Sequence, residues 1–138
     1  MKKKQVQNLF NFTLNLIHKN IGIGETDNIQ LQKYIDKIGL SNFLGIYAWD
    51  TIPKMINNQS CIVNLDKSTE SGSHWISLYK YKNKIYMYDS FNRKISNFRK
   101  VDIDSNMYQK NRQSDCGQRS ITFLTLVEII GLYDTLKL

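Results

Sequence analysis

The sequence predicts an α+β fold in which a central mixed β-sheet is flanked by helices. Three observations carry this prediction: apolar residues at helical spacing near the N-terminus, strand-like segments in the middle, and a long apolar helix near the C-terminus. The chain has 138 residues, one proline and no linker-like stretch, so we expect a single domain over residues 1–138. Residues 1–41 should form its N-terminal helical part, and residues 42–138 the sheet and the final helix.

Three helices are expected. Residues 4–19 repeat apolar side chains at roughly helical spacing, which predicts an amphipathic helix. Asp27 or Asn28 can cap a second helix, for which Gly39 is a natural stop. The segment 116–132 is apolar on nearly every side, as in a helix buried in the middle of a domain.

The strands are expected between the second and third helices. Segment 42–48 is mixed apolar and aromatic and predicts a short strand or loop, followed by a turn of helix near 54–57. Residues 60–65 are rich in β-forming side chains, and a further strand is expected near Tyr108.

A β-hairpin is expected in the middle of the chain. Residues 75–81 alternate as a strand does, and residues 84–89 follow after the short turn Lys82-Asn83. Such a turn places the start of the first strand beside the end of the second. His74 and Asp89 are therefore expected to be near neighbours across the ladder.

Composition and charge exclude some classes of protein. No run approaches the ~18 apolar residues of a membrane span. The lysines at the N-terminus are followed by Asn and Gln residues that spoil a signal peptide, so we expect a chain that is not secreted. The net charge of +7 favours acidic partners such as nucleic acid, although charges spread along the chain are more typical of a solvated surface.

Two cysteines are present, and they lie in different surroundings. Cys61 opens an apolar strand and resembles a buried structural cysteine, whereas Cys116 follows polar residues and precedes the final helix. A sulfur in the first turn of a helix feels the positive end of the helix dipole and unpaired N–H groups, both of which favour the nucleophilic thiolate. A disulfide between the two does not fit a reducing compartment.

A thiolate needs a base, and the chain has two histidines. His18 is expected to be a partly exposed histidine of the first helix, so His74 is the better base, with Asp89 as the carboxylate that orients it. Gln109 and Gln113 both precede Cys116, and either amide suits an oxyanion donor.

A zinc site is a poor alternative to a cysteine nucleophile. The histidines and cysteines lack zinc-binding spacings such as C-x-x-C. There is also no glycine-rich phosphate loop, since Gly22-Ile-Gly24 does not form that motif.

Several motifs occur together in a characteristic order. They are Phe43-Leu44-Gly45 before Pro53, Ile62-Val63-Asn64, Gly72-Ser73-His74-Trp75, Tyr86-Met87-Tyr88-Asp89 and Asp115-Cys116-Gly117. In this order the chain resembles the adenovirus-type maturation cysteine proteases (adenain) and the related ubiquitin-like-protein proteases, and the likeness covers most of residues 42–130. The resemblance implies the cysteine-peptidase fold of that type, with the nucleophile at the N-terminus of a buried helix.

The resemblance assigns roles to residues. It implies that His74 is the base, Asp89 its orienting partner and Cys116 the nucleophile. The family's oxyanion glutamine stands six or seven residues before its cysteine, which favours Gln109 and keeps Gln113 in reserve. Trp75 is implied to pack beside the site. Together with Gly72 and Ser73, from the Gly-x-His-Trp element, it is expected to bind substrate.

The resemblance also implies a biological setting. The expected activity is cleavage of viral capsid or core precursor proteins, after glycine, during virion maturation. The enzyme would act as a monomer in the virion and at the viral assembly site of the host cell. A virophage or large DNA virus is the expected source, which suits a composition rich in Lys, Asn and Ile. No cofactor is required by this chemistry.

The chain also departs from the adenovirus enzymes. Those enzymes are stimulated by DNA and by an activating peptide, but the segment that receives the peptide is not matched here. Gln118-Arg119 stands where apolar residues commonly follow the Cys-Gly. Two other functions remain open: an isopeptidase acting on ubiquitin-like host modifiers, and a catalytically idle, basic nucleic-acid-binding domain.

Overall fold

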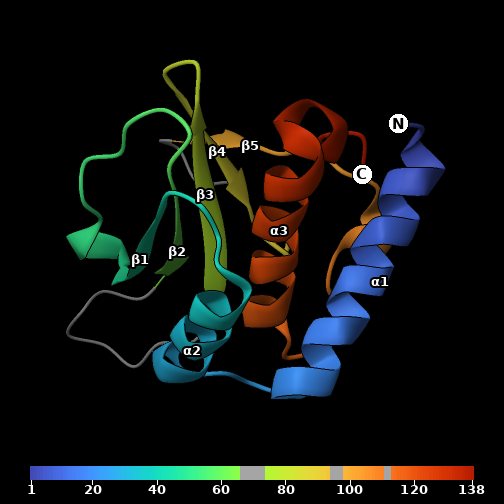
Figure 1. Cartoon of the computed structure of the whole chain (residues 1–138), viewed down its shortest axis with the longest axis horizontal. Helices are drawn as coiled ribbons and strands as arrows, with labels where there is room; N and C mark the ends of the chain where they lie inside the picture. Colours follow the sequence, from blue (N-terminus) through green and yellow to red (C-terminus); the bar gives the residue numbers. More distant parts are fainter. Residues whose placement is uncertain (66–73, 94–97, 111–112) are drawn as a thin grey trace.

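The protein folds as an α+β structure with three α-helices and a five-stranded mixed sheet (Figure 1). A computed structural model describes residues 1–65, 74–93, 98–110 and 113–138. The α-helices are α1 (Lys3–Ile21), α2 (Asn28–Ile38) and α3 (Cys116–Thr135). The strands are β1 (Phe43–Ala48), β2 (Ser60–Asn64), β3 (Trp75–Tyr81), β4 (Lys84–Tyr88) and β5 (Arg99–Lys100). Two short 3-10 helices, η1 (Trp49–Thr51) and η2 (Ser105–Met107), lie in the connections.

The strands follow chain order across the sheet, β1-β2-β3-β4-β5. Strand β1 runs parallel to β2, β3 is antiparallel to both β2 and β4, and β5 is parallel to β4. The turn between β3 and β4 has positive φ at both Lys82 (48°) and Asn83 (63°), as a tight hairpin turn requires. The predicted hairpin and its register are therefore confirmed.

Local chemistry explains the ends of helix α2. The side chain of Asp27 accepts a hydrogen bond from the backbone N–H of Gln30 at 2.8 Å, while the Gln30 side chain accepts one from the N–H of Asp27 at 2.9 Å. These reciprocal bonds form a capping box. At the other end Gly39 adopts the left-handed conformation (φ 69°, ψ 53°) that a glycine tolerates without strain.

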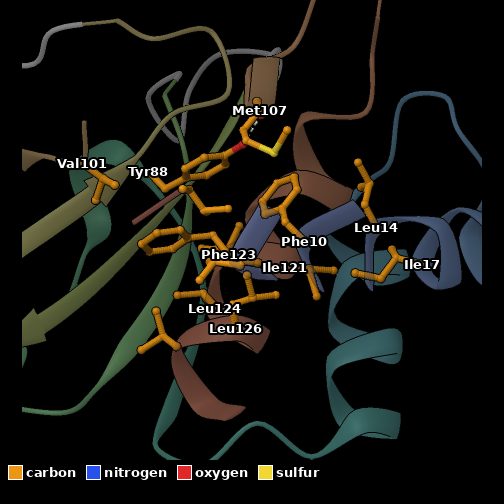
Figure 2. Packing of buried hydrophobic residues seen from close by; sticks show 14 of the residues in the cluster. Phe10, Leu14, Ile17, Tyr88, Val101, Met107, Ile121, Phe123, Leu124 and Leu126 are labelled. Carbon is orange, nitrogen blue, oxygen red and sulfur yellow. Dashed lines mark hydrogen bonds between the residues drawn. The ribbon is translucent and has the colours of Figure 1, made fainter. Parts of the chain in front are cut away.

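All three α-helices share one hydrophobic core with one face of the sheet. Phe10 of α1, Tyr88 of β4 and Phe123 of α3 meet at its centre, and the rings of Tyr88 and Phe123 stack with centroids 5.0 Å apart (Figure 2). Burying aromatic side chains of this size is worth several kcal/mol at ~25 cal/mol per Å² of apolar surface. This packing fixes helix α3, and with it Cys116, against the sheet.

The opposite face of the sheet carries a smaller core. Cys61 and Val63 of β2 pack there with Met55 of the β1–β2 connection, which covers this face in place of a helix. The side chains alternate between the two cores because successive residues of a strand point to opposite faces: Ile62 joins the helical side. The helices therefore flank the sheet on one face.

Two sequence-based expectations about local structure are wrong. The helical turn lies at Trp49–Thr51 rather than near 54–57, directly after β1. The additional strand is Arg99–Lys100, and Tyr108 lies just after η2 instead of in a strand. The Tyr108 hydroxyl donates a hydrogen bond to the carbonyl of Val101 at 3.1 Å, so this aromatic residue is held by a side-chain bond and not by strand pairing. Within the described ranges, no helix is long and apolar enough to cross a bilayer.

Candidate active site

His74 and Asp89 lie at adjacent ends of the β3–β4 hairpin. His74 immediately precedes β3 and Asp89 immediately follows β4, and the register pairs Ser77 with Tyr88. The imidazole Nε2 of His74 lies 2.5 Å from Oδ1 of Asp89, and each residue is only 1% exposed. The predicted juxtaposition of these two residues is therefore present.

Asp89 is held as a carboxylate. Its Oδ1 also accepts a hydrogen bond from the backbone N–H of Phe91 (2.8 Å), and Oδ2 accepts one from the N–H of Arg93 (3.2 Å). Burial raises the pKa of Asp89, but the hydrogen bond with His74 and those from the backbone lower it more, so the pKa lies below its ordinary value of 3.8. This charge is available to stabilise an imidazolium on His74.

The surroundings of His74 act on its pKa in opposite directions. Burial lowers the pKa of His74, yet hydrogen bonding and charge interactions with Asp89 and Cys116 outweigh it and raise the pKa above 6.5. Nδ1 is buried, with no partner inside hydrogen-bond geometry among the described residues. Because Nε2 is occupied by Asp89, Nδ1 is the ring nitrogen left for Cys116, whose Sγ accepts a hydrogen bond from the N–H of the adjacent Trp75.

Phe91 covers one face of this imidazole. The two rings stack with centroids 4.3 Å apart and an interplanar angle of 25°, while Phe91 itself stays 38% exposed. It thus lies between His74 and solvent. An aromatic cover of this kind keeps water from competing for the hydrogen bond between His74 and Asp89.

Cys116 is the first residue of helix α3 and is 7% exposed. The backbone N–H of Trp75 donates to its Sγ at 3.4 Å, so the residue after His74 contacts the sulfur directly. One turn along α3, the hydroxyl of Ser120 donates to the carbonyl of Trp75 at 3.2 Å. These two bonds fasten the start of β3, which directly follows His74, to the first turn of α3.

Trp75 also reaches the connection between α1 and α2. Its indole Nε1 donates a hydrogen bond to the carbonyl of Thr26 at 2.9 Å. Trp75 therefore lies beside Cys116, as the resemblance implies. Gly72 and Ser73, also expected to bind substrate, fall outside the residues that the structure describes.

Gln109 has a fixed side-chain orientation. Its Oε1 accepts a hydrogen bond from the hydroxyl of Ser90 at 2.8 Å, and its Nε2 donates to the carbonyl of Gln113. A carbonyl can only accept, so the nitrogen end of the amide is assigned without ambiguity. Among the described residues, the second N–H of this amide has no hydrogen-bond partner.

The side chain of Gln113 is used differently. Its Oε1 accepts hydrogen bonds from the backbone N–H of Lys110 (2.6 Å) and from Nη2 of Arg119 (3.4 Å). Gln113 is exposed, whereas Gln109 is only 9% exposed. Of the two glutamines left open by the sequence, Gln109 has the buried and oriented amide.

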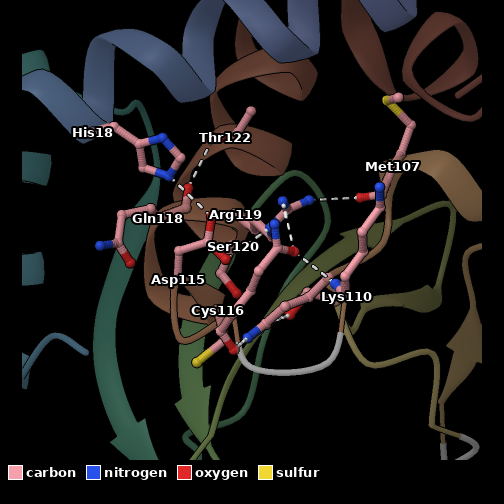
Figure 3. A network of polar contacts seen from close by, with 12 residues as sticks. His18, Met107, Lys110, Asp115, Cys116, Gln118, Arg119, Ser120 and Thr122 are labelled. Atoms are coloured by element: carbon pink, nitrogen blue, oxygen red, sulfur yellow. Dashed lines mark hydrogen bonds and ion pairs between the residues drawn. The ribbon is translucent and has the colours of Figure 1, made fainter. Parts of the chain in front are cut away.

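A polar network that sequence reasoning missed surrounds the start of α3 (Figure 3). His18 Nε2 lies 2.9 Å from Oδ2 of Asp115, and Nε of Arg119 donates to Oδ1 of Asp115 at 3.0 Å. His18 is partly exposed as expected, with 21% of its side chain accessible, but its partnership with Asp115 spans 97 positions of sequence. The spacing of Asp115 and Arg119, one helical turn apart, is a sequence signal for part of this network.

Neither a metal site nor a similarity to known proteins identifies the function of this chain. In the described part of the chain, no group of three or more His, Cys, Asp or Glu side chains is arranged to hold a metal ion. No family model matches this chain, and no curated protein or solved structure is significantly similar to it.

Proposed function

We propose that this protein is a cysteine endopeptidase of the adenain type. One observation carries the proposal: the backbone N–H of Trp75, the residue after His74, donates to Cys116 Sγ at 3.4 Å, while the His74 ring is paired with the buried carboxylate of Asp89. A base held between a buried carboxylate and a thiol is the arrangement that activates a cysteine nucleophile. The motif order and the α+β architecture with Cys116 at the start of a buried helix support the same assignment.

In the proposed mechanism, His74 takes the proton of Cys116 and the resulting thiolate attacks a peptide carbonyl. A C–S bond forms, and the carbonyl oxygen becomes an oxyanion. His74 then donates its proton to the leaving amine as the C–N bond breaks. Water, deprotonated by His74, attacks the acyl-enzyme and releases the acid and the free thiol.

Oxyanion stabilisation is assigned to the first turn of α3 and to Gln109. The first backbone bond of this helix runs from Arg119 N–H to the carbonyl of Asp115 at 3.0 Å, which leaves the N–H groups of Cys116 and its two successors outside the helical ladder. In the described chain, the carboxylate of Asp115 does not cap them, because it bonds His18 and Arg119. Unused N–H groups at a helix N-terminus are suited to hold developing negative charge.

The substrate follows from the resemblance. We propose viral capsid or core precursors cut after glycine, with DNA or a peptide as a stimulant. The net charge of +7 supports encounter with acidic partners, DNA included.

The test compares the wild-type chain with Cys116→Ala and with Cys61→Ala as the matched control. Each protein is incubated with a glycine-containing peptide library, with and without DNA, and cut sites are read by mass spectrometry. We expect cleavage by wild type and Cys61→Ala but none by Cys116→Ala. Cleavage that survives in Cys116→Ala would end the proposal.

The same experiment separates the alternatives. Cleavage of a reporter ending in Gly-Gly of a ubiquitin-like modifier, without cleavage of structural precursors, would favour an isopeptidase. A chain that binds DNA with steep salt dependence and cuts nothing would be a binding domain.

A further inference from the structure

Helix α3 begins with two buried polar side chains that reach in different directions. Gln118 is fully buried, and its Nε2 donates to the carbonyls of Gly22 and Gly24, each at 2.9 Å. Arg119 is 8% exposed and turns toward the segment before the helix. A buried cation is costly unless its hydrogen bonds are satisfied, so the position of Arg119 calls for an explanation.

The guanidinium of Arg119 uses all three nitrogens. Nε bonds the Asp115 carboxylate, Nη1 donates to the carbonyl of Met107 at 3.1 Å, and Nη2 donates to Oε1 of Gln113 at 3.4 Å (Figure 3). The planar fork of arginine can satisfy acceptors in three directions at once, which a lysine ammonium on a flexible stem does not reproduce. Arg119 thus joins the turn that bears Cys116 to the chain from 107 to 113.

The two acceptors of Arg119 that lie outside the helix flank Gln109 in the sequence. Met107 precedes it, and Gln113 follows it and also receives the hydrogen bond of its amide. The backbone N–H of Gln109 donates to the carbonyl of Ser90 at 2.8 Å, which ties the same segment to the residue after Asp89. The location of Gln109 relative to Cys116 is therefore set from one side by Ser90 and from the other by Arg119.

Asp115 holds Arg119 and is itself held by His18. Its two oxygens are divided between the guanidinium (3.0 Å) and the imidazole of helix α1 (2.9 Å). A free carboxylate beside Cys116 would oppose negative charge on the sulfur, so its pairing with a cation also suits thiolate chemistry.

We propose that Arg119 is a positioning residue that holds the Gln109 amide in register with Cys116. This inference rests on the proposed function, in which Gln109 is an oxyanion donor. Arg119 touches no reacting atom and acts through Met107 and Gln113. A displacement of Gln109 by about 1 Å would lower turnover roughly 10–100-fold without a matching change in substrate binding.

The first experiment measures this positioning without any activity. Amide exchange is followed by NMR in the full-length wild type, Arg119→Met, Arg119→Lys and the control Arg99→Met, which removes an exposed cation. We expect the backbone N–H of Gln109 to exchange about tenfold faster in both Arg119 variants than in wild type. Backbone amides of strand β3, which report global opening, serve as the reference. The Arg99 control should match wild type. Unchanged exchange at Gln109 would overturn the inference even if the chain cleaves no peptide. Arg119→Lys keeps a cation and serves if the methionine variant does not fold.

The second experiment uses a fluorogenic peptide in which glycine precedes the scissile bond. We expect kcat to fall roughly 10–100-fold in Arg119→Met and in Arg119→Lys, with KM within about threefold of wild type. Arg119→Met combined with Gln109→Ala should be no more than about threefold slower than Gln109→Ala alone, because both changes remove the same contribution. Additive losses, or full activity in Arg119→Lys, would show that Arg119 does not act through Gln109. Absence of cleavage by the wild type would instead refute the proposed function.

Discussion

Gly117, directly after Cys116, has no room for a Cβ. A Cβ at this position would lie 2.4 Å from Oγ1 of Thr26 and 2.9 Å from Cδ2 of Leu31. Both distances are shorter than a Cβ tolerates, so in Gly117→Ala the side chains of Thr26 and Leu31 must move away from helix α3. Overpacking of this kind costs about 1–3 kcal/mol. The better helix propensity of alanine returns at most about 1 kcal/mol.

A double-mutant cycle with Thr26→Ala makes the test specific. The Thr26 hydroxyl is buried with no partner inside hydrogen-bond geometry among the described residues, so its removal alone should change stability by less than about 1 kcal/mol. In the Gly117→Ala background it removes the 2.4 Å contact, while the contacts with Leu31 remain. We therefore expect Thr26→Ala to recover about half of the loss, which is a coupling of roughly 0.5–1.5 kcal/mol.

The assay is urea denaturation followed by tryptophan fluorescence, with the midpoint compared at constant slope. Gly24→Ala is the matched control, because a Cβ there meets nothing within 4 Å in the same connection. It should stay within about 0.5 kcal/mol of wild type. A Gly117→Ala protein as stable as wild type, or a loss that Thr26→Ala does not relieve, would refute the close packing.

The remaining predictions concern the site. Asp89→Asn should lower kcat by about 10²–10⁴-fold. It should also shift the alkaline limb of the pH–rate profile to lower pH, because Asp89 helps to raise the pKa of His74. An alkaline limb at the wild-type pH would contradict this. Asp89 has a lowered folded-state pKa and contributes stability that is lost as the pH falls, whereas His74 has a raised one and contributes stability that is lost as the pH rises. Denaturation of wild type and Asp89→Asn should therefore differ most between the ordinary pKa values of 3.8 and 6.5, and a constant difference would argue against the pair. Gln109→Ala should slow turnover by about 10²–10³-fold, and a smaller loss than tenfold would exclude it as an oxyanion donor. Iodoacetamide should label Cys116 and spare Cys61 in the folded chain, as mass spectrometry can check, because burial raises the pKa of the Cys61 thiol to about 12.

Much of the fold could be predicted because its information is local. The capping box at Asp27, the stop at Gly39 and the tight turn at Lys82-Asn83 each depend on a few consecutive residues. The hairpin register then follows from the turn, which is why His74 and Asp89 could be paired without a structure. Strand β5 is too short to show a period, and it forms because its neighbour β4 offers a free edge.

The contacts around Cys116 could be predicted only in part. The motifs point to Cys116, and the resemblance favours Gln109 over Gln113, but the hydrogen bonds around these residues join distant segments. The Ser90 hydroxyl on Gln109 and the His18 imidazole on Asp115 are examples. Hydrophobic periodicity in the sequence cannot predict such bonds, because each depends on how the helices pack against the rest of the fold. Arg119 within an otherwise apolar helix is a sequence signal for polar partners at this position, since a buried cation must be paired.

The hairpin has a consequence for the order in which the site assembles during synthesis. His74 and Asp89 are separated by 15 positions, whereas the bond from Trp75 to the sulfur spans 41. Closing the shorter loop costs less entropy, and a ribosome makes the segment that completes it earlier. A nascent chain can thus form the His74–Asp89 pair before Cys116 has been translated, so the proposed cysteine chemistry would begin only after helix α3 has docked.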